Sequence, residues 1–159
     1  MSLSDERTLR LAAAALSAIG IGIATYIAIA ESGGGSPVCL AGGHGCQTVA
    51  DSSYSHLLGI NVAAIGIAGY VALLAAALWP GDWGRVGGLT LALIGLGFSL
   101  YLTYLELFVI EAVCQWCVAS AVVMALLLIV NLIRALRFGG SELAAPAPGA
   151  LREEPTLRG

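Results

Sequence analysis

The sequence contains no lysine and few charged residues of any kind. All seven basic residues are arginine, and Asp, Glu, Lys and Arg together make up 11% of the 159 residues, whereas soluble domains contain about 25%. So few charges cannot cover the surface of a globular protein of this size. The chain also has no continuous basic stripe, which excludes nucleic-acid binding as its function.

Long apolar segments take the place of the missing charges. Hydrophobic residues make up 58% of the chain, and the mean hydropathy is +0.91. These residues gather in four apolar runs. Each run has about the 20 residues that a helix needs to cross a bilayer, and each is too long for a strand. The sequence therefore predicts an all-α integral membrane domain over residues 1–138, a bundle of four transmembrane helices. The four runs cover residues 9–30, about 57–78, about 86–110 and about 112–133.

The positions of the arginines predict the orientation of these helices. Two precede the first run, one lies between the second and the third, and four follow the last: Arg7, Arg10, Arg85, Arg134, Arg137, Arg152 and Arg158. By the positive-inside rule both termini are cytoplasmic. The loop from Glu31 to His56 then faces outward, for example from a bacterial or archaeal cell membrane.

The first apolar run and the last residues of the chain each have features of their own. Ala28-Ile29-Ala30 is similar to a signal-peptidase site, but the apolar run before it exceeds the roughly 7–15 residues of a signal peptide. We therefore expect a retained first helix. Residues 139–159 contain three prolines and no apolar periodicity, which is typical of a disordered tail, here a cytoplasmic one.

All four cysteines fall on the predicted outer side. Cys39 and Cys46 lie in a glycine-rich loop, and Cys114 and Cys117 form a Cys-x-x-Cys at the start of the last helix. Disulfides form and persist outside the cytoplasm, and a helix N-terminus lowers the pKa of a thiol. The pattern favours a redox relay, in which a mobile loop pair exchanges disulfides with the helix pair.

Other interpretations of the cysteines stay open. They could form two structural disulfides, a zinc site, or small apolar side chains in a core. The spacing Cys39-x6-Cys46 is wide for zinc, and we expect no metal. The main rival function is a small transporter or structural membrane protein with stapling disulfides. Transporters usually bury ionisable residues near the middle of the membrane, where this sequence has almost none.

These residues resemble the vitamin K epoxide reductase family, in its prokaryotic disulfide-forming branch. The resemblance covers roughly residues 10–136. The DsbB family also contains quinone-linked disulfide oxidases with four helices, but there the Cys-x-x-Cys pair comes first and the wider pair later. In this chain the order of the two cysteine pairs is reversed. The matching motifs are Cys39-x6-Cys46, Ser52, Leu57-Leu58-Gly59-Ile60, and Cys114-Gln115-Trp116-Cys117 followed by Ser120.

The resemblance implies a bundle that encloses a quinone (menaquinone, ubiquinone or a vitamin K type) under a capping outer loop. Cys117 would lie beside the quinone, with Cys114 as its resolving partner. Cys46 would pass electrons to Cys114, and Cys39 would receive them from a DsbA- or thioredoxin-like protein. The resemblance thus implies a membrane thiol–disulfide oxidoreductase that reduces quinone and supports disulfide-bond formation. Ser52 would support the loop helix at the quinone site.

The chain departs from the family pattern in places. Ala121 stands where animal members have a tyrosine, which argues against animal-type epoxide turnover; reduction of vitamin K quinone or its epoxide stays an open expectation. Asn61 stands where Gly-Ile-Pro is common, so the entry into the second helix is expected to differ. We expect the redox partner to be a separate protein, because only a short tail follows the last helix.

Three further residues near the outer helix ends are candidates for the quinone site. A carboxylate inside a membrane is a functional candidate, so Glu106 is expected to handle quinone protons; the alternative is that it reaches the headgroups and is solvated. Tyr101 and Trp116 are expected to line the quinone pocket. Aromatic side chains are also common at membrane interfaces without any such role.

Overall fold

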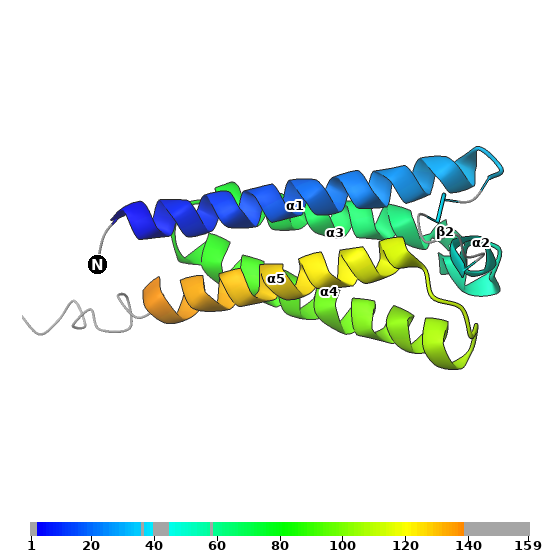
Figure 1. Ribbon diagram of the computed structural model, residues 1–159. Coiled ribbons are helices and arrows are strands. Elements are labelled where there is room, and N and C mark those ends of the chain that lie inside the picture. Colours follow the sequence, from blue (N-terminus) through cyan, green and yellow to red (C-terminus); the bar gives the residue numbers. More distant parts are fainter. Residues whose placement is uncertain (1–2, 36, 40–44, 58, 139–159) are drawn as a thin grey trace, which may run out of the picture.

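The computed structural model describes residues 3–35, 37–39, 45–57 and 59–138 (Figure 1). These residues are mostly helical, as the sequence predicts. The tail expected over residues 139–159 lies outside the described residues. The elements are α1 (Leu3–Ser32), α2 (Gly45–Ala50), η1 (Ser53–Ser55), β1 (His56–Leu57), β2 (Ile60–Asn61), α3 (Val62–Leu78), α4 (Asp82–Phe108) and α5 (Gln115–Phe138).

The four long helices lie side by side, and α2 lies across one end of them (Figure 1). Helix α1 packs against α3 and α5, and α4 packs against the same two helices. The core between them is apolar, and Tyr70, Leu73 and Leu127 are among its buried members. By length and hydropathy, α1, α4 and α5 can each cross a membrane, whereas α3 is apolar but has only 17 residues.

The second long helix begins later than the sequence predicts. The apolar run was expected to be helical from about Leu57, but α3 starts at Val62. Before it, His56–Leu57 pairs antiparallel with Ile60–Asn61, and Gly59 at the turn has a φ of 81°, a conformation that favours glycine. The Asn61 side chain then accepts a hydrogen bond from the Ala63 N–H at 2.7 Å. Such a cap fixes where a helix starts, and hydropathy does not detect it.

Arginine and cysteine side chains occupy opposite ends of the molecule. At the arginine end, where α1 begins and α5 ends (Figure 1), Arg85 forms ion pairs with Glu6 at 2.9 Å and with Asp82. Arg10 donates to backbone carbonyls at the end of α3 at 3.1 and 2.6 Å. At the cysteine end, α1 ends, α5 begins and α2 lies beside them. The described arginines at the arginine end are Arg7, Arg10, Arg85, Arg134 and Arg137.

Candidate functional site

The four cysteines form one closed pair and one open pair. Cys39 and Cys46 are joined by a disulfide with an S–S distance of 2.02 Å, and the Cys46 N–H donates to the Cys39 sulfur at 3.2 Å. Cys114 and Cys117 are free thiols. The loop pair, Cys39 and Cys46, is thus oxidised, while the pair at the start of α5, Cys114 and Cys117, here called the inner pair, is reduced. The closed pair also removes two of the four thiolates that the zinc alternative requires.

A close backbone contact brings the two pairs together. An added Cβ on Gly45 would overlap the Val113 carbonyl, so only glycine allows α2 to lie this near to the segment that leads into α5. Gly45 directly precedes Cys46, and Val113 directly precedes Cys114. Cys46 and Cys114 are both buried, with 1% and 2% of their surface exposed. The contact therefore places one cysteine of each pair on facing segments.

Cys114 lies immediately before the first residue of α5. Its sulfur interacts with the Cys117 thiol and with the backbone N–H groups of Trp116 and Cys117. A helix N-terminus favours a negative charge because its first N–H groups have no partner within the helix. The hydrogen bond with the Cys117 side chain, followed by those from the two N–H groups, lowers the pKa of the Cys114 thiol to about 7 despite its burial.

We expect Cys114 in the reduced protein to become reactive as the pH rises through about 7, since the thiolate is the nucleophile. Replacing Cys117 with alanine removes the largest stabilising interaction, so the midpoint should rise toward the ordinary thiol value of about 8.5. The measurement is the rate at which methyl methanethiosulfonate modifies Cys114 across this pH range, located by mass spectrometry. An unchanged midpoint in the variant would contradict the role of the Cys117 hydrogen bond.

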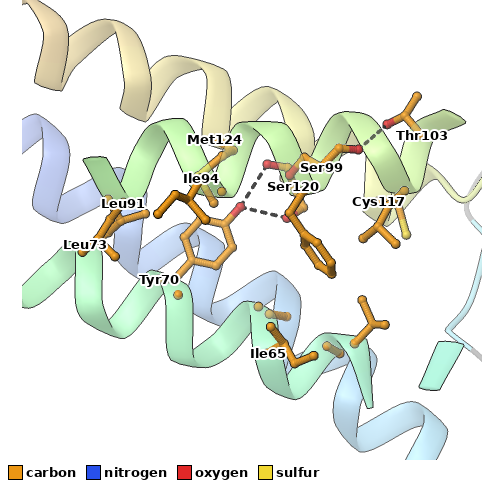
Figure 2. Close-up of a pocket in the computed structure, with 18 residues that line it drawn as sticks. Ile65, Tyr70, Leu73, Leu91, Ile94, Ser99, Thr103, Cys117, Ser120 and Met124 are labelled. Carbon is orange, nitrogen blue, oxygen red and sulfur yellow. Dashed lines mark hydrogen bonds between the residues drawn. The ribbon is translucent and has the colours of Figure 1, made fainter. Parts of the chain in front are cut away.

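A cavity of about 290 Å³ lies between α3, α4 and α5, with Cys117 in its wall. Figure 2 shows Cys117 toward one end of this cavity and Leu73 and Leu91 toward the other. Most of the lining is apolar, and the polar side chains are few: Tyr70, Ser99, Thr103 and Ser120. Such a lining suits an apolar ligand with a small number of polar atoms.

Tyr70 is a buried polar residue in the wall of this large cavity. Its hydroxyl donates to the Ser120 carbonyl at 2.9 Å and lies 2.8 Å from the Ser120 hydroxyl (Figure 2). The ring packs directly over Gly20 of α1, where a Cβ would overlap it. The hydroxyl group is therefore held beside α5, one turn of helix beyond Cys117. The sequence carries no signal for Tyr70, because nothing in its neighbourhood along the chain distinguishes it from a core tyrosine.

A second, smaller cavity of about 60 Å³ shares Cys117 with the first. Ser52 and Glu106, both expected at the site, contribute to its wall, and so does Glu31 from the end of α1. The Ser52 hydroxyl donates to the Val49 carbonyl at 2.7 Å, which ties η1 to α2. Cys117 therefore lies where a large apolar cavity and a small polar one meet.

Glu106 is buried, with 3% of its surface exposed, so the alternative of a solvated carboxylate is wrong. Its side chain accepts a hydrogen bond from the Cys114 N–H at 3.1 Å and also forms one with the Cys117 thiol. Its backbone carbonyl accepts from the Ala112 N–H at 3.0 Å. Glu106 thus anchors the turn between α4 and α5 and contacts the reduced cysteine pair directly.

Neither of the two aromatic candidates lines a described cavity. Tyr101 is half exposed on α4 and is absent from the walls of both cavities. The Trp116 indole N–H instead donates to the Val38 carbonyl at 3.0 Å, and its ring packs on Tyr26 with centroids 4.8 Å apart. The Tyr26 hydroxyl accepts from the Val38 N–H at 3.1 Å. Trp116 and Tyr26 therefore hold the segment that leads into Cys39.

The part of the chain that contains the site also matches a known protein family. Residues 11–132 match the vitamin K epoxide reductase family, and this range contains all four cysteines, Glu106 and the residues that line both cavities. The apolar helices and the disulfide agree with a membrane oxidoreductase. This chain therefore belongs to the vitamin K epoxide reductase family.

Proposed function

We propose that this protein is a quinone-dependent thiol–disulfide oxidoreductase of the membrane, which oxidises a DsbA- or thioredoxin-like protein and so supports disulfide-bond formation. The observation that carries the proposal is the position of Cys117. The Cys117 thiol forms a hydrogen bond with Cys114, which lies near the loop disulfide, and Cys117 also forms part of the wall of the large apolar cavity. One residue thus joins the cysteines to a site for a lipid-soluble acceptor.

The cavity residues suit a quinone. A quinone has an apolar ring with two carbonyl oxygens, and the cavity offers an apolar lining with the Tyr70 and Ser120 hydroxyl groups at one place and the Cys117 thiol at another. Its volume of about 290 Å³ is near the lower limit of the roughly 300–1,000 Å³ typical of small-molecule sites. Ser52 and Glu106 line the smaller cavity, which shares Cys117 with the large one.

The proposed electron path uses the two pairs in sequence. A dithiol of the partner reduces the Cys39–Cys46 disulfide and is itself oxidised to a disulfide. The Cys46 thiolate then attacks the sulfur of Cys114 in an oxidised Cys114–Cys117 pair, and Cys117 leaves as a thiolate. Cys39 attacks Cys46, which restores the Cys39–Cys46 disulfide and frees Cys114. The disulfide and the two free thiols of the structure correspond to the state that follows this step.

The inner pair then passes its electrons to the quinone. Cys114 and Cys117 form a disulfide, which releases two electrons and two protons. A bound quinone would serve as the acceptor, and the two electrons and two protons would convert it to quinol. The cysteines return to the oxidised state that the next partner molecule requires, so two electrons move from one partner dithiol to one quinone in each cycle.

We further propose a membrane bundle in which α3 spans together with α1, α4 and α5. The arginine end would be cytoplasmic, as the positive-inside rule requires, and the cysteine end would face the exterior, with the loop around α2 covering the site. Exchange with a soluble partner requires access to Cys39, and Val38 beside it is 66% exposed. This arrangement would let the partner reach Cys39 from outside the membrane.

Quinone reduction by the purified protein tests the proposed function. With a reduced DsbA-like protein and a short-chain quinone, we expect quinol to form in proportion to the partner disulfide produced. Omitting either the partner or the membrane protein should reduce the rate to background. A folded protein that oxidises no partner and reduces none of several quinones would contradict the proposal and favour a stapled structural or transport protein.

A further inference from the structure

We propose that Glu106 is a catalytic residue that carries protons between Cys117 and the quinone, and that the smaller cavity supplies these protons from outside the membrane. This inference deepens the proposed function and rests on it. The carboxylate reaches both residues of the inner pair, through the Cys114 N–H at 3.1 Å and the Cys117 thiol. No other carboxylate in the described residues contacts these cysteines.

The need for such a group follows from the balance of the reaction. Quinone reduction requires two protons as well as two electrons, and the large cavity is almost entirely apolar. Cys117 lies in the walls of both cavities, and its proton needs an acceptor when the disulfide forms. In the proposed step the Glu106 carboxylate accepts the Cys117 proton and donates it to a quinone oxygen. Glu106 then returns to the carboxylate form, so its charge is the same before and after the step.

The second proton must reach the site from water when Cys114 starts as a thiolate. The smaller cavity provides a route, because its wall contains Glu106 and Cys117 together with the polar residues Glu31 and Ser52 and the half-exposed Tyr54. Its volume of about 60 Å³ has room for water, since one water needs about 10–15 Å³ of such space. Water and the polar side chains can then pass protons inward to Glu106.

Titratable groups near Glu106 come from α1, from η1 and from the start of α5. Cys114 and Cys117 face it from the start of α5, Glu31 faces the same cavity from α1, and Tyr54 does so from η1. The described lining residues from α3 and α4, other than Glu106 itself, are apolar: Val62, Ala63, Leu102 and Leu105. A change in the pH dependence of Glu106 variants therefore reports on this small set of groups.

The decisive variant is Glu106→Gln, because glutamine keeps an oxygen that can accept from the Cys114 N–H but does not accept the Cys117 proton. The fully reduced protein is mixed with a short-chain quinone, and quinol formation is followed in a single turnover. We expect the variant to be about 10-fold slower. Because its protons must then come from cavity water, we also expect a larger solvent isotope effect and a rate that falls as the pH rises. The loss is smaller than the usual 10²–10⁴-fold of general acid–base catalysis, because cavity water partly replaces the carboxylate.

Two further variants separate a proton role from a structural one. Glu106→Asp should recover at least half of the lost rate, since it restores a carboxylate. Glu111→Gln is the matched control: Glu111 is exposed in the same turn, and its variant should behave like the wild type. If Glu106→Gln does not fold, Glu31→Gln tests the same route at another residue of the cavity wall, with an expected slowing of about threefold.

The possible outcomes distinguish the inference from the proposed function. If the wild type reduces quinone and Glu106→Gln matches it in rate, pH profile and isotope effect, Glu106 only anchors the turn and the inference is wrong. An equal loss in Glu111→Gln would overturn it as well, and so would wild-type behaviour of Glu31→Gln where Glu106→Gln does not fold. If the wild type itself reduces no quinone, the proposed function fails instead.

Discussion

Replacing Cys117 with serine is expected to reduce quinone reduction to the uncatalysed background, the largest effect of any single substitution. Cys117 forms part of the wall of the large cavity and interacts with Cys114, so its loss would remove the proposed inner disulfide and the thiol at the proposed acceptor site. Serine keeps the size and a hydrogen-bonding hydroxyl group but cannot form a disulfide. The measurement is quinol formation with either a reduced partner protein or dithiothreitol as the electron donor.

The two electron donors locate the defect. A Cys39→Ser variant should lose turnover with the partner protein and keep part of the turnover with dithiothreitol, because a small dithiol can reduce the inner pair directly. Cys117→Ser should lose both. Val118→Ser is the matched control, since Val118 is the next residue of α5 and is exposed. Quinone reduction by Cys117→Ser above background with either donor would show that Cys117 is not on the electron path.

Replacing Gly45 with valine is expected to slow partner-driven turnover on the order of 100-fold. The Cβ of any larger residue would overlap the Val113 carbonyl, and a backbone atom cannot move aside as the end of a side chain can. Overpacking of this kind costs about 1–3 kcal/mol, and 3 kcal/mol corresponds to roughly 150-fold. Because Gly45 and Val113 directly precede Cys46 and Cys114, the cost falls on exchange between the two pairs.

The substitution should separate the two half-reactions. Turnover with dithiothreitol should stay within about twofold of wild type, because the inner pair and the large cavity are unchanged, while turnover with the partner protein falls. Gly33→Ala is the control, since an added Cβ there meets its nearest neighbour at an ordinary 3.5 Å. Wild-type turnover of Gly45→Val with the partner would indicate that the close approach of α2 to Val113 is not needed for exchange.

Local sequence was sufficient for the helices but not for their starting points. Apolar runs of about 20 residues predicted four helices, and α1, α4 and α5 follow the predicted ranges within a few residues at most boundaries. The predicted start of the second helix at about Leu57 was wrong, because Gly59 and Asn61 interrupt the apolar run. Both signals were present in the sequence, but hydropathy averages over a window, and a turn with a cap depends on single residues.

The candidate site was also predicted only in part from the sequence. The spacing of the cysteines identified all four, and the structure contains one of the pairs as a disulfide. Tyr101 and Glu106 were both assigned to the quinone pocket, although residues five apart on an α-helix point about 140° away from each other. Tyr101 is 50% exposed and Glu106 is 3% exposed, so only the second faces the cysteines.

The sequence by itself determined the class of protein, the number of long helices, the four cysteines and the family, because these depend on composition and on spacing along one chain. Only the tertiary structure decided which residues meet: Gly45 with Val113, Glu106 with Cys114, and Tyr70 with Ser120. These partners are separated by 8 to 68 residues in the chain. Their contacts depend on the rotation of each helix about its own axis, which the packing of neighbouring helices sets.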